Sequence, residues 1–154
     1  MNTQNQKLLL EQIDRKLAVL KPLEKLIIPQ RGWIFTIRTA LKMSLRQLGN
    51  KLGISSQSVN EIEEREINGN ITIKSLRDVA NALGLKLVYG FIPKGESIEN
   101  MVETRAYEIA REIVLRTSNT MKLEDQENSK LRIEKSIKEK AEEIKNKMPK
   151  YLWD

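Results

Sequence analysis

The segment from residue 44 to residue 63 contains two short amphipathic stretches with a glycine, Gly53, between them. Apolar residues recur at helical spacing on both sides of this glycine: Leu45, Leu48, Leu52, Ile54, Val59 and Ile62. Ser44 precedes the first stretch and Ser55 or Ser56 precedes the second, and serine is a preferred N-cap residue. Glycine readily adopts the left-handed conformation that a sharp turn needs. The segment therefore predicts two short helices joined by a tight turn.

Two more helices are expected to pack around this pair. The first runs from about Trp33 to Lys42 and has its apolar face formed by Trp33, Ile37 and Leu41. The other opens at Thr72 and is closed by Gly84. Residues 85–92 then alternate in a β-rich pattern, which predicts one strand ending at Pro93.

Helical segments flank this core on both sides. Residues 10–20 carry an apolar stripe at helical spacing, and residues 21–32 read as a connector. Residues from 97 onward predict a helix, and a last helix is expected before Pro149, followed by an apolar tail that docks on the protein. We therefore expect an N-terminal helix and connector (1–32), a core domain (33–93) and a helical C-terminal region (94–154).

The side chains most used in catalysis and metal binding are scarce in this chain. It has no cysteine and no histidine, so disulfides, thiolate metal sites and histidine bases are excluded. We expect a protein that is not an enzyme and that holds no cofactor and no metal. No apolar run approaches the roughly 20 residues of a membrane span, and the first ten residues lack a signal-peptide pattern. A cytoplasmic protein without membrane contact is expected.

The net charge of +6 is unevenly distributed. Residues 1–92 carry 14 Lys and Arg against 8 Asp and Glu, whereas residues 93–154 carry 13 of each kind. A basic half suits a polyanion, and a balanced half suits protein contacts or a solvated helical surface.

A tight turn between two short helices lets the second helix project into the major groove of DNA. The polar residues at its projecting end are the candidate base-reading residues: Ser55, Ser56, Gln57, Ser58 and Asn60. Arg46, Lys51 and Arg38 are candidates for contacts with the phosphate backbone. The alternative interpretation of the serines and Gln57 is plain helix capping and solvation.

Residues 33–91 resemble the XRE/Cro-repressor family, with residues 44–48 and 56–59 at the centre of the likeness. The resemblance implies a mainly α fold: a lambda-repressor-like helix-turn-helix core with one short β-strand, an N-terminal helix and a C-terminal helical extension. It also implies that Ser56, Gln57, Ser58 and Asn60 read bases of double-stranded operator DNA. Four glutamates crowd the far end of the same helix and are expected to point away from DNA: Glu61, Glu63, Glu64 and Glu66.

Residues outside the core resemble the family called mobile mystery protein A. The segments that carry this likeness are residues 17–23, 31–33, 120–126 and 152–154. The resemblance implies an antitoxin whose partner is a Fic-domain toxin, an enzyme that transfers AMP to target hydroxyls.

Inhibitors of such toxins carry Ser or Thr, three residues, Glu, and then Gly or Asn. Thr120 and Glu124 match this pattern, but Asp125 stands where Gly or Asn is usual. Thr104 and Glu108 have the same spacing and are the second candidate pair. The resemblance implies that the glutamate pairs with an arginine in the toxin's phosphate site, as a carboxylate can do bidentately.

Three functions therefore remain open at this point. One is a repressor that is also an antitoxin, with Thr120 and Glu124 as its inhibitory residues. Another is a stand-alone regulator whose C-terminal helices serve only dimerisation or a response to an effector. The third is a protein adaptor whose helix-turn-helix no longer binds DNA, because the far end of its second helix is acidic. For a repressor, a homodimer on paired half-sites is expected, with residues 10–20 or the last helix as its seam.

Overall fold

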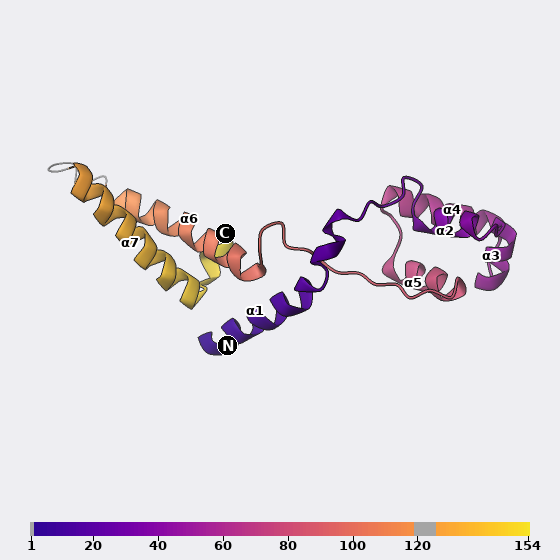
Figure 1. Ribbon diagram of the computed structural model, residues 1–154, viewed down its shortest axis with the longest axis horizontal. Helices are drawn as coiled ribbons and strands as arrows, with labels where there is room; N and C mark the ends of the chain where they lie inside the picture. Colours follow the sequence, from indigo (N-terminus) through magenta and orange to yellow (C-terminus); the bar gives the residue numbers. More distant parts are fainter. Residues whose placement is uncertain (1, 119–125) are drawn as a thin grey trace. The chain divides into compact units, whose positions relative to one another are not determined.

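The computed structural model describes residues 2–118 and 126–154, and of residues 126–128 it describes the backbone alone (Figure 1). The chain divides into two compact units: Met1–Lys21 with Phe91–Asp154, and Pro22–Gly90. We call these the terminal unit and the central unit. The mainly α fold that the sequence predicted is confirmed. No helix in the described ranges is long and apolar enough to cross a membrane.

The central unit holds α2 (Trp33–Ala40), α3 (Leu45–Leu52), α4 (Ser56–Asn68) and α5 (Ile73–Ala82). Its buried apolar residues come one from each helix: Ile34, Leu48, Val59 and Val79. Every apolar residue that the glycine-centred pattern assigned to the inside belongs to this core or packs against it. The order of helices and the turn between α3 and α4 were therefore readable from the sequence.

The caps of these helices confirm the expected boundaries. Ser44 caps α3 in a reciprocal capping box with Gln47, and Thr72 caps α5 through the backbone N–H of Ser75. Gly53 follows α3 with φ +70°, the left-handed conformation that was expected for the turn.

The buried face of α2 differs from the prediction by one residue. Trp33 and Leu41 are exposed, whereas Ile34 and Arg38 are buried. Hydrophobic periodicity assigns an arginine to solvent. The predicted buried face of α2 is therefore rotated relative to the face that is buried in the structure. The face that is buried includes the arginine because a carboxylate from α4 accompanies it into the core.

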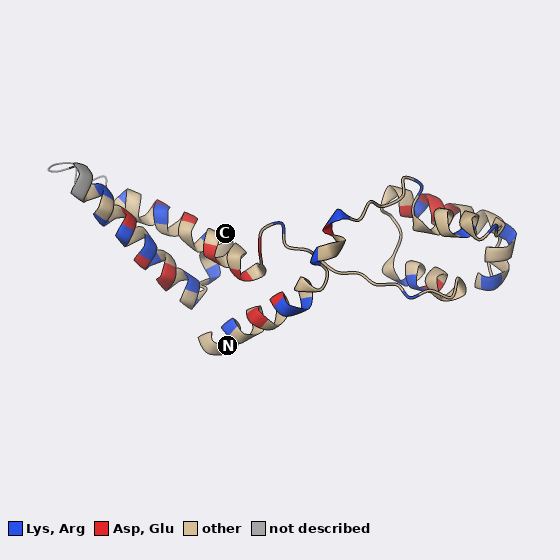
Figure 2. Ribbon diagram, in the orientation of Figure 1, with Lys and Arg blue, Asp and Glu red and all other residues tan. Residues whose placement is uncertain are grey.

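The terminal unit holds α1 (Thr3–Ala18), α6 (Ile98–Ser118), α7 (Gln126–Lys147) and the 3₁₀ turn η2 (Lys150–Trp153); a second 3₁₀ turn, η1 (Lys21–Lys25), follows α1 at the unit boundary. Its buried core is formed by Val102, Ala106, Ala110, Ile137, Ile144 and Leu152. Leu152 is fully buried, so the apolar tail docks as predicted. Figure 2 shows Lys, Arg, Asp and Glu interspersed along α6 and α7.

A long-range cap joins α1 to α6 within the terminal unit. The carboxylate of Asp14 accepts hydrogen bonds from the backbone N–H groups of Ile98 at 2.7 Å and Glu99 at 3.1 Å. These N–H groups have no partner inside their own helix, and the negative charge suits the helix N-terminus. Asp14 therefore holds the first helix of the chain against a helix that begins more than eighty residues later.

The predicted strand is absent. Residues 85–92 form neither helix nor strand, and no backbone hydrogen bond joins residues 86–92 to another segment in the part of the chain that the structure describes. A β-rich pattern selects an extended backbone, whereas a strand also requires a neighbouring segment with free N–H and C=O groups. The core domain therefore ends in an unpaired connector.

Of the two seams expected for a dimer, the last helix is largely used inside the terminal unit, and the residue 10–20 stripe is used at one residue. Leu10 of the residue 10–20 stripe packs against the core of that unit. In α7, Ile137 and Ile144 are buried, and Ala141 and Met148 pack beside them. Their apolar area is thus already removed from water within one chain.

Candidate nucleic-acid interface

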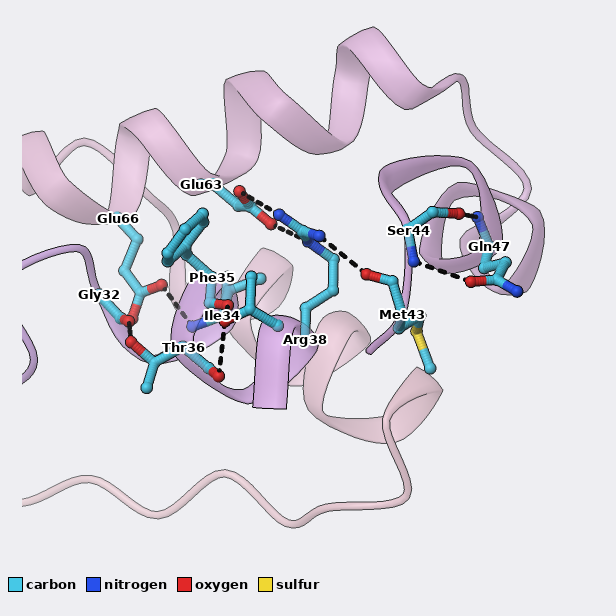
Figure 3. Close-up of polar contacts among 11 residues, drawn as sticks. Gly32, Ile34, Phe35, Thr36, Arg38, Met43, Ser44, Gln47, Glu63 and Glu66 are labelled. Atoms are coloured by element: carbon cyan, nitrogen blue, oxygen red, sulfur yellow. Dashed lines mark hydrogen bonds and ion pairs between the residues drawn. The ribbon is translucent and has the colours of Figure 1, made fainter. Parts of the chain in front are cut away.

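A buried ion pair fixes α4 to α2. Arg38 Nε lies 2.5 Å from Glu63 Oε1, and Arg38 Nη2 donates to Glu63 Oε2 at 3.2 Å (Figure 3). The third nitrogen, Nη1, donates to the Met43 carbonyl oxygen at 2.8 Å. Both side chains are buried, with 9% and 6% of their surfaces exposed. The bidentate geometry sets both the distance and the rotation between the two helices.

A second carboxylate of α4 caps α2. Glu66 accepts hydrogen bonds from the backbone N–H groups of Trp33 at 2.7 Å and Ile34 at 2.9 Å. Gly32 precedes α2 with φ +80°, and a Cβ placed there would lie 2.8 Å from the Glu66 carboxylate. The positive φ favours glycine, and a side chain at this position would push the Glu66 carboxylate away from the cap.

Two of the four glutamates at the far end of α4 thus have partners inside the central unit. Glu63 and Glu66 point into the central unit (Figure 3). Glu61 lies 3.8 Å from Arg65, and Glu64 accepts from Asn60 at 3.2 Å. The spacing of Val59, Glu63 and Glu66 along one helix face was the signal in the sequence that could have assigned these two glutamates inward.

The turn before α4 is close-packed. A Cβ on Gly49 would lie 2.6 Å from the carbonyl oxygen of Ile54, so α3 and the turn approach each other more closely than alanine allows. Ile54 N donates back to the Gly49 carbonyl at 2.9 Å. The direction in which α4 leaves the turn is therefore set by backbone contact.

The first turn of α4 presents polar groups to solvent. The Ser55 hydroxyl caps the helix by accepting from Ser58 N at 3.1 Å, and its oxygen lies 2.9 Å from the Ser58 hydroxyl. Ser56 and Gln57 are exposed, and neither side chain hydrogen-bonds to any described residue. Two of the four residues are thus occupied in capping, and two remain open to a ligand.

The other candidate residues lie in different environments. Arg46 and Lys51, both on α3, are exposed and form no ion pair with described residues. Asn60 is half-buried and donates to Glu64. Arg38 is enclosed by Glu63 and Met43, so its guanidinium is not available to a phosphate.

The candidate inhibitory residues Thr120 and Glu124 lie outside the described residues. The second pair, Thr104 and Glu108, is exposed on α6. Arg105 donates to Glu108 at 3.2 Å and to the carbonyl oxygens of Leu152 and Asp154. Glu108 therefore already has a partner on its own helix.

Comparison with known proteins agrees with the geometry of the central unit. Residues 34–89 match a helix-turn-helix family model, and this range runs from the first turn of α2 to the connector after α5. No curated protein and no solved structure matches the chain. Residues 34–89 are thus a helix-turn-helix domain of the XRE type, the kind found in DNA-binding regulators.

Proposed function

We propose that this protein is a transcription regulator that reads double-stranded operator DNA with the N-terminal end of α4. The exposure of Ser56 and Gln57 at the first turn of that helix carries the proposal, since neither side chain is used by the described part of the protein. Glutamine can pair bidentately with adenine, and serine can bond to several base edges or to phosphate. A helix that projects from a glycine turn can place these groups in the major groove.

The surrounding charges support a docking mode with phosphate contacts on α3. Arg46 and Lys51 are exposed there, and no described acidic side chain neutralises them. The central unit carries ten Lys and Arg against six Asp and Glu. The buried Arg38 and Glu63 neutralise each other, which leaves nine Lys and Arg against five Asp and Glu in the rest of the unit. Arg38 is not part of the proposed DNA interface, because it is buried against Glu63 and Met43.

The test of base reading is Gln57→Ala, measured on a duplex that the protein itself selects from a random pool. We expect binding to weaken by about 1–3 kcal/mol, with relaxed specificity at one base pair. Gln12→Ala, an exposed glutamine on α1, is the matched control and should bind like the wild type. Equal affinity of Gln57→Ala and Gln12→Ala would contradict the assignment.

The test of phosphate contact is Arg46→Ala. We expect it to weaken binding to all sequences similarly and to reduce the slope of log K against log salt by about 1. Arg132→Ala, an exposed arginine on α7, removes the same charge from the other unit. A wild-type slope for Arg46→Ala, or an equal change for Arg132→Ala, would exclude a specific phosphate contact at Arg46.

The resemblance to mobile mystery protein A supports a second proposal, that the chain also neutralises a Fic-domain toxin through Glu124. The balanced charge of residues 93–154 is compatible with a protein partner. Co-expression with a neighbouring Fic-domain protein tests it: Glu124→Ala should restore AMP transfer while DNA binding stays intact. Loss of inhibition in Glu108→Ala instead would move the site to Glu108. A toxin unaffected by the wild-type chain would leave the stand-alone regulator, whose C-terminal helices serve dimerisation alone.

A further inference from the structure

An acidic side chain lies on the same face of α4 as the proposed reading residue Gln57. Glu61 follows Gln57 by four residues, a spacing that places both side chains on one helix face, about 6 Å apart along the axis. Both residues are exposed. Unlike Glu63 and Glu66, Glu61 forms no hydrogen bond with any described residue. Glu61 therefore faces the same surroundings as Gln57.

The nearest group of opposite charge holds Glu61 only weakly. Arg65 Nη2 lies 3.8 Å from Glu61 Oε2, which is beyond hydrogen-bond distance. The Arg65 side chain is 57% exposed and that of Glu61 is 49% exposed. Exposed ion pairs of this kind contribute little to stability. The Glu61 carboxylate can therefore exchange this neighbour for a hydrogen-bond donor that a ligand supplies.

Glu64, the other exposed glutamate of α4, is less well placed to meet a ligand at the start of the helix. It lies seven residues after Gln57, roughly 10 Å further along the axis. Its Oε1 already accepts a hydrogen bond from Asn60 at 3.2 Å. When a helix enters the major groove by its N-terminal end, the residues near that end contact the bases. Glu61 is therefore the acidic residue that such a helix would bring closest to base edges.

The chemistry of a carboxylate restricts which base it can meet. An ionised carboxylate accepts hydrogen bonds and donates none. In the major groove cytosine presents the N4 amino donor alone, whereas guanine presents two acceptors and thymine presents an acceptor and a methyl group. Adenine presents a donor directly beside an acceptor, N7. Cytosine is therefore the base that offers a carboxylate a donor without an adjacent acceptor.

We propose that Glu61 sets the sequence specificity of this protein by accepting a hydrogen bond from the N4 amino group of cytosine, close to the base pair that Gln57 reads. This inference rests on the function proposed above, because it requires the first turns of α4 to meet bases. At another base the carboxylate loses its water and gains no donor, which is costly. Glu61 thus acts chiefly by penalising wrong sequences.

The negative charge also predicts a pattern of affinities that a structural residue would not give. Glu61→Gln keeps the size of the side chain and removes a charge that the phosphates repel. Binding to random-sequence DNA should therefore strengthen about threefold. The ratio between the affinities for selected and random DNA should fall about tenfold. A change that merely damaged α4 would weaken binding to both kinds of DNA.

The test is selection from a random pool of duplexes by the full-length wild type, Glu61→Gln and Glu61→Arg. Glutamine pairs bidentately with adenine, and arginine pairs bidentately with guanine. At one base pair we expect cytosine for the wild type, adenine for Glu61→Gln and guanine for Glu61→Arg. Glu64→Gln is the matched control, because it removes the same charge from an exposed position of the same helix, and it should keep cytosine.

Failure of this inference can be told apart from failure of the proposed function. A wild-type protein that selects no sequence would contradict the reading function, and the role of Glu61 with it. If Gln57→Ala relaxes the specificity but both Glu61 variants select the wild-type sequence, the reading function stands and the role of Glu61 is wrong. A change of the cytosine in Glu64→Gln as large as that in Glu61→Gln would also overturn the assignment.

Discussion

The two units of this protein use the same device to begin a helix and different devices to hold their helices together. In the central unit Glu66 caps α2, and in the terminal unit Asp14 caps α6. In both cases one carboxylate accepts two backbone N–H groups of a helix far away in the sequence. One side chain of another helix can thus fix where a helix begins.

The interiors differ in kind. The central unit buries Arg38 and Glu63 beside four apolar side chains, whereas the buried residues in the described part of the terminal unit are all apolar. The ion pairs of the terminal unit lie at its surface, where Lys145 bonds to Glu103 and lies 3.5 Å from Glu99. A buried, bidentate pair fixes one geometry but is costly to break, and exposed pairs contribute little. The central unit is therefore the one whose geometry depends on a polar contact.

Breaking the buried Arg38–Glu63 ion pair should produce the largest loss of stability. Glu63→Ala leaves the Arg38 guanidinium buried without its partner, and we expect a loss of about 3–5 kcal/mol in the free energy of unfolding of the central unit. Urea unfolding followed by hydrogen exchange of peptides from α2 to α5 measures it. Glu64→Ala, the exposed neighbour, should change this value little.

The double replacement Arg38→Met with Glu63→Leu removes both charges of the pair and is compared with Glu63→Ala, which removes one. It should recover most of the lost stability, because the desolvation cost of both charges is removed together. Equal stability of Glu63→Ala and the wild type would show that the pair does not hold α2 and α4 together.

Removing the Asp14 cap at the start of α6 should cause an intermediate loss of stability. Asp14→Ala leaves the first N–H groups of α6 without their acceptor, at a cost of about 1 kcal/mol. Hydrogen exchange should rise in the first turn of α6 and in α1 while the central unit is unchanged. Glu11→Ala, one turn earlier on α1, is the control. Faster exchange confined to α1 in both variants would argue against a capping role for Asp14.

The surface pairs of α7 should have the smallest effect. Hydrogen bonds from Lys147 and then Lys140 lower the pKa of Glu143 to about 2, from a usual value near 4.5. A lowered folded-state pKa stabilises the protein above pH 4.5, and the contribution is lost as the pH falls toward 2. Glu143→Gln should therefore shift the urea midpoint of the terminal unit slightly at neutral pH, and the shift should vanish near pH 2 or in high salt. A shift of equal size at both pH values would exclude the ion pairs as its cause.

The local features of the fold could be predicted because their causes are local. Ser44, Ser55 and Thr72 act within their own first turn, and Gly53 acts through its own φ angle. The apolar stripes of α4 and α6 follow from helical spacing alone. The order of helices in the central unit was derived from such signals, as was the docking of Leu152.

The features that the sequence did not indicate are those that need a partner distant in the chain. Arg38 was assigned to a phosphate contact because arginines are usually solvated, but its partner Glu63 is 25 residues away. The connector 85–92 was assigned to a strand because its residues favour extended backbone, but pairing requires a second segment. Glu66 and Asp14 were not recognised as caps for the same reason.

The sequence by itself determined where helices begin and end in the central unit, which residues of α3 and α4 face its apolar core and which polar residues lead α4. These depend on backbone preferences and periodicity, which act over a few residues. Tertiary structure alone decided which charges are buried and which remain available. Whether Arg38 or Arg46 can meet a phosphate depends on a carboxylate that folding brings beside one of them and not the other. The free energy of a charge is set by its surroundings in space, and neighbours in the sequence do not specify those surroundings.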